Sequence, residues 1–336
     1  MPRKPPVAIG QCVNLSGMPF PLPTFDDVLS AAARIAPHAH VTPVLQSGTL
    51  NALASAELHF KAEHLQRVGA FKFRGACNAV WSLSEDGARA GVVTHSSGNH
   101  GAALALAART RGIACHVVVP EGAVAAKVAS IQRYGATVHA CAAGIAAREE
   151  KCAQVQEATA AVLVHPYTDP RVIAGQGTAA LELLNATDAL DVLVVPVGGG
   201  GLAAGTAIAA AALAPDCKVL LAEPEGAADT FRSLAAGQRR VDFTPDTICD
   251  GLRGSLGQPN FELLRQYAVD VVTVSDARTV AAMRLFWQVT KQLVEPSSAI
   301  ALAAVLQDPA RFAGQRIGVL LSGGNVDLDA LPWGRP

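Results

Sequence analysis

Aromatic and charged residues are scarce in this chain of 336 residues: aromatics make up 5% and charged residues 16%, while 50% is hydrophobic. Disordered proteins have the opposite composition, with few apolar residues and a high charge. With a net charge of −1, the chain lacks the positive electrostatic potential by which proteins bind nucleic acid. We therefore exclude nucleic acid as a partner. Ala, Val and Leu must fill the core, and such small side chains favour close helix–sheet packing in an α/β protein.

The sequence also lacks a disulfide or metal-binding cysteine pattern. The cysteines are odd in number, scattered, and without a Cys-x-x-Cys pair: Cys12, Cys77, Cys115, Cys141, Cys152, Cys217 and Cys249. We expect reduced thiols, mostly buried, in a cytoplasmic protein.

No segment is a convincing signal peptide or membrane span. Residues 1–23 have no apolar run and several prolines, so we expect an arm that lies over the surface or is partly disordered. Between Asp191 and Asp216 there are 24 uncharged residues, but a proline and four consecutive glycines interrupt them. We expect a buried strand, a glycine turn and a buried helix there, and no membrane partner.

From residue 91 onward, short β-branched runs alternate with helical patterns. We predict strands at 91–97, 113–120, 136–142, 161–166, 191–197, 218–225, 269–275 and 316–324. We predict helices at 99–112, 123–135, 147–159, 172–186, 202–213, 277–294 and 298–307. The strands are continuous apolar runs, which is typical of a parallel sheet covered by helices on both faces. The ligand site of such a sheet lies at the carboxyl ends of its strands.

Several loops in such positions carry chemically useful residues. Lys72 lies between Phe71 and Phe73 in FKFRGA, where desolvation would lower its pKa and suit a Schiff-base nucleophile. The alternative is a lysine that reaches solvent from an element edge. In SSGNHG, the segment 96–100 lies where a strand gives way to a helix, so hydroxyls and backbone amides there predict an anion site rather than a simple helix cap.

The glycine run 198–201 follows a buried strand and lets backbone amides approach a phosphate. The same glycines also meet a loose dinucleotide-binding fingerprint, and Glu223 at the end of the next strand could bind the ribose. An NAD-dependent oxidoreductase is therefore the alternative to an enzyme that binds another phosphate-bearing cofactor. Glu223 and Asp229 could instead hold a divalent cation, or be solvated loop acids. Ser322 ends the last buried strand in SGGN and has no nucleophile-elbow pattern.

Taken in this order, the motifs resemble the pyridoxal-phosphate enzymes of fold type II, above all the serine racemase and serine/threonine dehydratase family. The resemblance covers about residues 42–328. It implies an α/β fold like that of the tryptophan synthase β subunit, with the cofactor in the cleft between two parallel-sheet domains. Residues 1–85 and 168–336 would form the large domain, and residues 86–167 the small domain that carries the substrate loop. We also expect a homodimer.

The resemblance implies a role for each matching residue. Lys72 would bind the cofactor covalently, the glycine loop would hold its phosphate, and Ser322 would bind its pyridine nitrogen. The cofactor-binding residues would be Lys72, Phe71, Asn99, Gly198, Gly199, Gly200, Gly201, Leu202 and Ser322. The residues that bind the small amino-acid substrate would be Ser96, Ser97, Gly98, Asn99, His100 and Arg148. Glu223, the carbonyl of Ala227, and Asp229 would bind Mg²⁺ or Mn²⁺.

The implied activity is removal of water and ammonia from an L-β-hydroxy amino acid of the serine, threonine, 3-hydroxyaspartate or phenylserine type. Lys72 would take the Cα proton. Ser97 can act on the opposite face of Cα, so an amino acid racemase is the alternative. Ala70 and Tyr167 depart from the residues that relatives often have there, which puts a simple transfer of serine as substrate in doubt.

Overall fold

The computed structural model describes residues 21–123 and 125–333 of the chain. Cys12 and all but the last residues of the expected amino-terminal arm lie outside these ranges. The six cysteines within them are buried and form no disulfide, as expected. No helix in this part of the chain combines the length and the hydrophobicity that a membrane span needs.

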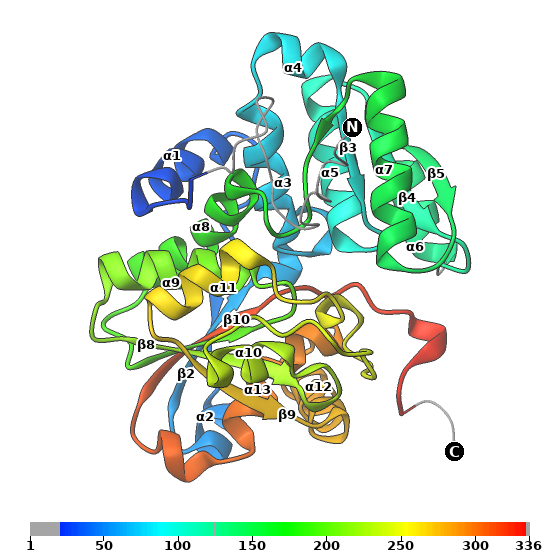
Figure 1. Cartoon of the computed structure of the whole chain (residues 1–336). Helices are drawn as coiled ribbons and strands as arrows, with labels where there is room; N and C mark the ends of the chain where they lie inside the picture. The colour runs from blue at the N-terminus through cyan, green and yellow to red at the C-terminus, as the bar shows by residue number, and fades with distance from the viewer. Residues whose placement is uncertain (1–20, 124, 334–336) are drawn as a thin grey trace.

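Two sheets organise the chain (Figure 1). The six-stranded sheet has the order β1-β2-β10-β7-β8-β9, and only the β1–β2 pair is antiparallel. Its strands are β1 (Val44–Leu45), β2 (Glu57–Ala62), β7 (Val192–Pro196), β8 (Lys218–Pro224), β9 (Asp270–Val274) and β10 (Arg316–Leu321). The other sheet is parallel with the order β5-β4-β3-β6. Its strands are β3 (Val92–His95), β4 (Cys115–Pro120), β5 (Thr137–Cys141) and β6 (Val162–Leu163).

Helices connect these strands and cover the sheets. They are α1 (Phe25–Ile35), α2 (Gly48–Ala54), α3 (Lys72–Trp81), α4 (Glu85–Ala90), α5 (Asn99–Arg111), α6 (Ala125–Arg133), α7 (Ile145–Thr159), α8 (Pro170–Ala186), α9 (Gly201–Leu213), α10 (Asp229–Ala236), α11 (Gln258–Gln266), α12 (Asp276–Thr290) and α13 (Pro296–Leu306). The predicted α/β fold with parallel sheets is confirmed. The domain limits at residues 85/86 and 167/168 stay a prediction; they fall outside the strands of the four-stranded sheet.

The prediction from the sequence is incomplete, and one predicted helix is too long. No element is predicted before residue 91, where the structure has β1, β2 and the helices α1 to α4, and α10 and α11 are not predicted either. The helix expected over 277–294 ends at Thr290, because Lys291 adopts a left-handed conformation with φ of 61°. The uncharged stretch after Asp191 forms β7, a glycine turn and α9, as predicted.

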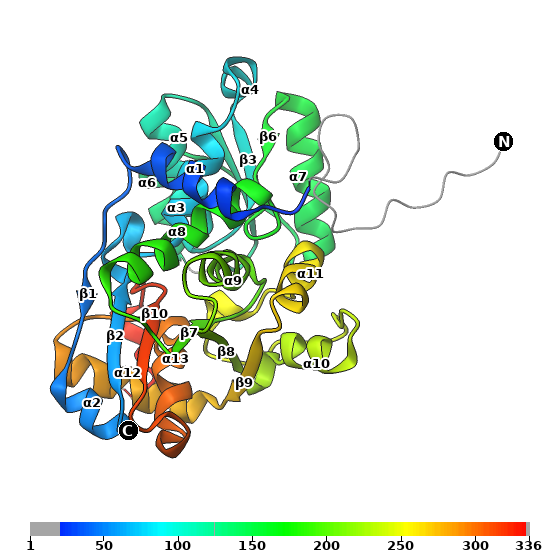
Figure 2. The same ribbon diagram turned by 90° about the vertical axis from the view of Figure 1, so that its left-hand side faces the viewer.

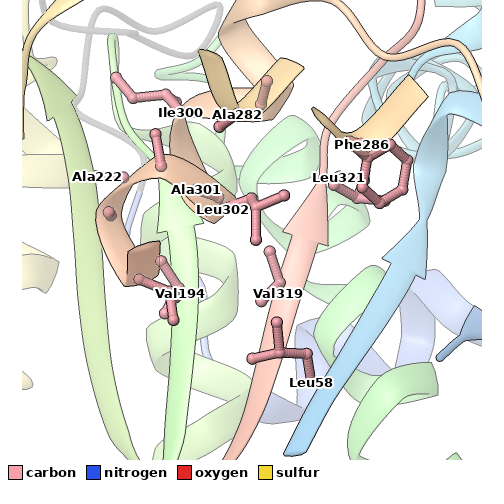
Figure 3. Close-up of a cluster of buried hydrophobic side chains, with 14 of the residues drawn as sticks. Leu58, Val194, Ala222, Ala282, Phe286, Ile300, Ala301, Leu302, Val319 and Leu321 are labelled. Carbon is pink, nitrogen blue, oxygen red and sulfur yellow. The ribbon is translucent and has the colours of Figure 1, made fainter. Parts of the chain in front are cut away.

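The six-stranded sheet is buried on both faces, since alternate side chains of its strands enter different cores. Val192 and Val194 of β7 pack with α12 and α13, whereas Leu193 and Val195 pack toward α8 and α9. Figure 2 shows these helix pairs on opposite sides of the sheet. Figure 3 shows Leu302 of α13 among Val194, Val319 and Ala301 in the first core. Continuous apolar strands, read from the sequence, follow from this double burial.

A buried ionic network fixes α3 against α8. The Arg74 guanidinium is fully buried and donates to Glu63 at 2.7 and 2.8 Å and to both oxygens of Glu182 at 2.7 Å. The two helices also approach closely, because a Cβ on Gly175 would lie 2.6 Å from the Cα of Gly75. Breaking a buried ion pair by removing one partner typically costs about 3–5 kcal/mol. The position of α3, which begins at Lys72, is therefore strongly determined.

Candidate active site

A cavity of about 520 Å³ lies where the carboxyl ends of β3, β4, β7 and β10 converge. Its wall contains every residue that the sequence analysis assigns to the cofactor or the substrate, including Lys72, Arg148 and Ser322. A cavity of this size suits a small molecule. Glu223 and Asp229 are not in the wall.

Lys72 is the first residue of α3. The expectation that it lies in a loop is therefore wrong. Its Nζ donates to the carbonyl oxygen of Pro166 at 3.0 Å and lies 5.1 Å from the centre of the Phe71 ring. Burial lowers the pKa of Lys72 to about 8, and the carboxylate of Glu295 opposes this shift. Part of the amine is therefore neutral near physiological pH, and the neutral amine is the form that attacks a carbonyl carbon.

The segment 96–100 joins β3 to the amino terminus of α5. The backbone amides of Ser97, Asn99 and His100 have no hydrogen-bond partner within the described chain. Free amides at a helix amino terminus bind anions, because they combine donors with the positive end of the helix dipole. The His100 ring faces Val164 instead, with its Nε2 3.3 Å from that carbonyl oxygen, and burial lowers the pKa of His100 to about 3.

The Asn99 side chain is held from both sides. Its Nδ2 donates to Glu295 Oε1 at 2.9 Å, and its Oδ1 accepts from Asn325 Nδ2 at 2.9 Å. Glu295 also accepts from the backbone N–H of Asn325 at 3.1 Å. This network orients the first side chain of α5 at the cavity wall.

The glycine loop between β7 and α9 has no room for side chains. A Cβ on Gly198 would lie 2.7 Å from the Cα of Leu252, and one on Gly199 would lie 2.4 Å from Cγ of Tyr167. Gly200 has a φ of 92°, which favours glycine over other residues. The loop leads into the amino terminus of α9, where Leu202 follows. Such a cradle of backbone amides fits a phosphate group.

Ser322 follows β10 and is buried, and its Oγ donates to the carbonyl oxygen of Ser297 at 3.3 Å. This bond is long, so the hydroxyl can turn toward a ring nitrogen placed in the cavity. Arg148 reaches the cavity from α7, and its buried Nε has no partner among the described residues. An unpaired guanidinium donor fits a carboxylate ligand.

Glu223 and Asp229 are fully buried, so the alternative of solvated loop acids is wrong. Glu223 lies in β8 itself and accepts from the backbone N–H groups of Thr230 and Phe231, both at 2.8 Å. Asp229 begins α10; its Oδ2 accepts from Leu256 N at 2.7 Å, whereas its buried Oδ1 has no partner among the described residues. Burial raises the pKa of Glu223 to about 7 and that of Asp229 to about 6.

Several charged or titratable residues of the cavity wall were not predicted from the sequence, among them Glu295, His95, Lys127 and Asp250. Glu295 is buried, and burial raises its pKa to about 7. Its only signal was an acidic residue before a proline, which equally marks an ordinary helix start. His95 ends β3 beside Arg148, and Lys127 of α6 forms an ion pair with Asp250 across the cavity. Neither a lone histidine nor two charges far apart in sequence predicts such a contact.

Comparisons with known proteins identify the family to which this chain is similar. The profile of the family described as "Pyridoxal-phosphate dependent enzyme" matches residues 35–323. A beta-hydroxyaspartate dehydratase of Paracoccus denitrificans is 48% identical over 93% of this chain and 99% of its own. The crystal structure of serine racemase from Dictyostelium discoideum is 46% identical, with a TM-score of 0.87 over 91% of this chain and 99% of its own. The crystal structure of a T.th. threonine deaminase is 44% identical, with a TM-score of 0.87 over the same shares.

We expect the Lys72 amine to react half-maximally near pH 8 in protein freed of bound small molecules. Burial destabilises the ammonium form, so the neutral amine forms well below the ordinary lysine pKa of about 10.4. Pulse labelling with dinitrofluorobenzene at a series of pH values, followed by mass spectrometry of the Lys72 peptide, gives the midpoint. Glu295→Gln removes a negative charge that raises this pKa, so the midpoint moves to lower pH. A Lys72 midpoint near pH 10, or an upward shift in Glu295→Gln, would contradict this account.

Proposed function

Because the chain belongs to the pyridoxal-phosphate dependent enzyme family, we propose that it is a dehydratase that converts an L-β-hydroxy amino acid into a 2-keto acid and ammonia. The observation that carries this proposal is the buried Lys72 amine, which shares one cavity with a glycine loop and a helix amino terminus. Relatives named as a beta-hydroxyaspartate dehydratase and a threonine deaminase support this substrate class. Membership of this family excludes an NAD-dependent oxidoreductase. Such an enzyme would need Glu223 in the cavity wall to bind the ribose, and Glu223 lies outside the wall.

The cavity fits the family's cofactor, because the glycine loop has no side chains to cover its backbone amides, and a Cβ at Gly198, Gly199 or Gly200 would clash with neighbouring protein atoms. Bound pyridoxal phosphate withdraws electrons from the Cα of an amino acid, and the surrounding groups decide which bond breaks. We assign its phosphate to the backbone amides of 198–201 and Leu202, its pyridine nitrogen to Ser322 and its 3-hydroxyl to Asn99. The ring of Phe71 would lie beside it.

The protein's own groups would then act on the substrate. The free amides of Ser97, Asn99 and His100 bind its α-carboxylate. Lys72 takes the proton from Cα, because its lowered pKa leaves a neutral amine available. The β-hydroxyl departs with the electrons of its C–O bond and takes up a proton, so that it leaves as water; this proton balances the one that Lys72 takes from Cα. Hydrolysis of the resulting enamine product then gives the keto acid and ammonia.

Among the candidate substrates we favour 3-hydroxyaspartate. Its second carboxylate needs a cationic partner, and Arg148 offers an unpaired guanidinium donor at the cavity wall. Serine and threonine have no group for this site. The Tyr167 ring, packed against Gly199, narrows the cavity near the glycine loop and disfavours the aromatic substituent of phenylserine.

We also propose a divalent cation, Mg²⁺ or Mn²⁺, bound by Glu223, Asp229 and the carbonyl of Ala227. Within residues 21–123 and 125–333, no three His, Cys, Asp or Glu side chains gather as a metal site. The donors would therefore be two carboxylates, a carbonyl and water, which suits a hard cation. The unpartnered, buried Oδ1 of Asp229 supports the assignment.

The remaining expectations concern the assembly and its surroundings. We propose a homodimer, as the resemblance to the family implies; exposed apolar side chains such as those of Val41 and Leu65 could lie in its interface. We propose a cytoplasmic location, which the buried, unpaired thiols support. We propose that residues 86–167 form a small domain that carries the substrate loop, with the cavity between this domain and the rest of the chain.

The dehydratase proposal predicts keto acid release from L-β-hydroxy amino acids by protein saturated with pyridoxal phosphate. We expect 3-hydroxyaspartate to be turned over with a kcat/KM about 100-fold above that of serine, because one buried charge-assisted contact contributes about that factor. Derivatisation of the keto acid with dinitrophenylhydrazine measures the product, and Mg²⁺ should stimulate its release. If only the D-enantiomer accumulates from each substrate, the enzyme is a racemase and the proposal is wrong.

Racemisation is the second candidate function, favoured by Ser97 at the cavity wall and by the serine racemases among the relatives. We expect Ser97→Ala to keep elimination of the L-substrate within about threefold, while activity on the D-enantiomer falls at least about 100-fold. The reason is that Lys72 serves one face of Cα and Ser97 the other. Chiral chromatography and keto acid assays on both enantiomers measure the split. Equal losses on the two enantiomers would contradict it.

A further inference from the structure

The segment 254–260, called the strap here, lies between the glycine loop and the buried Asp229. The backbone N–H of Leu256 donates to Asp229 Oδ2 at 2.7 Å. The backbone N–H of the next residue, Gly257, donates to the carbonyl oxygen of Gly199 at 3.1 Å. Two consecutive residues therefore join an acidic group outside the cavity to the loop that lines it.

Asn260 at the end of the strap makes the strongest link to the cavity. Its side chain is fully buried, and its Nδ2 donates to the carbonyl oxygens of Gly199 at 2.5 Å and Tyr167 at 2.9 Å. The residue before Tyr167 is Pro166, whose carbonyl oxygen accepts from Lys72. One amide group thus holds the glycine loop and the segment that contacts the lysine at a set spacing.

The strap cannot shift without moving the glycine loop. A Cβ on Gly200 would lie 2.8 Å from both Leu256 Cδ1 and the Cβ of Asn260. A Cβ on Gly257 would lie 2.3 Å from Cγ2 of Thr168. Packed groups at such separations transmit a displacement instead of absorbing it.

We propose that Asn260 is a positioning residue for the glycine loop, and that the strap couples this loop to Asp229, so that a divalent cation bound at Glu223 and Asp229 slows the loss of the cofactor. The inference rests on the proposed function. The two oxygens of Asp229 make it possible: Oδ2 is already bonded to the strap, and the unpartnered Oδ1 is free for a cation. A cation that fixes the carboxylate also fixes Leu256, and through it the amides that hold the phosphate.

The test measures how fast pyridoxal phosphate leaves the holoenzyme, in EDTA and in MgCl₂. Bound cofactor is quantified by absorbance after timed desalting and release in alkali. We expect Mg²⁺ to slow the loss several-fold in the unaltered protein. In Asn260→Ala, the cofactor should leave about tenfold faster in EDTA, because two hydrogen bonds to the loop segments are lost, and the Mg²⁺ effect should be smaller, because only the Gly257–Gly199 hydrogen bond and packing then join the strap to the loop. In Asp229→Asn, the Mg²⁺ effect should vanish.

The matched control is Gln258→Ala, a residue of the same helix whose side chain bonds to Glu262 at the surface. It should lose the cofactor at the unaltered rate and respond fully to Mg²⁺. The melting temperature of each cofactor-free variant checks folding; should Asn260→Ala not fold, Asp229→Asn decides the coupling.

Three results would overturn the proposal. A normal rate and a normal Mg²⁺ response in Asn260→Ala would show that Asn260 does not position the loop. Unaltered protein that binds the cofactor but holds it equally well in EDTA and Mg²⁺ would show that there is no coupling. Unaltered protein that binds no pyridoxal phosphate would overturn the proposed function itself, and the coupling with it.

Discussion

The buried guanidinium of Arg74 is the contact on which the cavity depends. It joins α3 to Glu63 and to Glu182 of α8 through hydrogen bonds of 2.7 to 2.8 Å, and the Arg74 and Glu63 side chains are fully buried. A charge in this position is tolerated only because both carboxylates satisfy it. Lys72 stands two residues earlier, at the start of the same helix. The network therefore sets where the Lys72 amine lies relative to the glycine loop. The loop itself is held between β7 and α9.

Burial and oriented backbone dipoles determine the electrostatics of the cavity. Burial lowers the pKa of Lys72 to about 8 and of His100 to about 3, and raises that of Glu295 to about 7, so each shift favours the neutral form. The amino termini of α5 and α9 supply positive potential without net charge. A chain with a net charge of −1 can in this way hold both a phosphate and a carboxylate. The neutral amine remains reactive in the same space.

The sequence predicted the features that depend on local pattern. The alternation of apolar strands and helices after residue 91 and the glycine turn before α9 both follow from neighbouring residues. It could not predict the burial of Glu223 and Asp229, because their surroundings come from segments far along the chain, such as Leu256. The contacts of Glu295 and Asn260 could not be predicted for the same reason, because their partners belong to segments that only the fold brings together. Short-range pattern predicts backbone shape, whereas the pairing of buried polar groups is a tertiary property.

The central claim is that the Lys72 amine carries pyridoxal phosphate. The most direct measurement is borohydride reduction of the protein after incubation with the cofactor, followed by digestion and mass spectrometry. The account predicts loss of the visible absorbance and one phosphopyridoxyl group per chain, on the peptide that contains Lys72. A label on another lysine, such as Lys127 at the cavity wall, or no label at all, would contradict it.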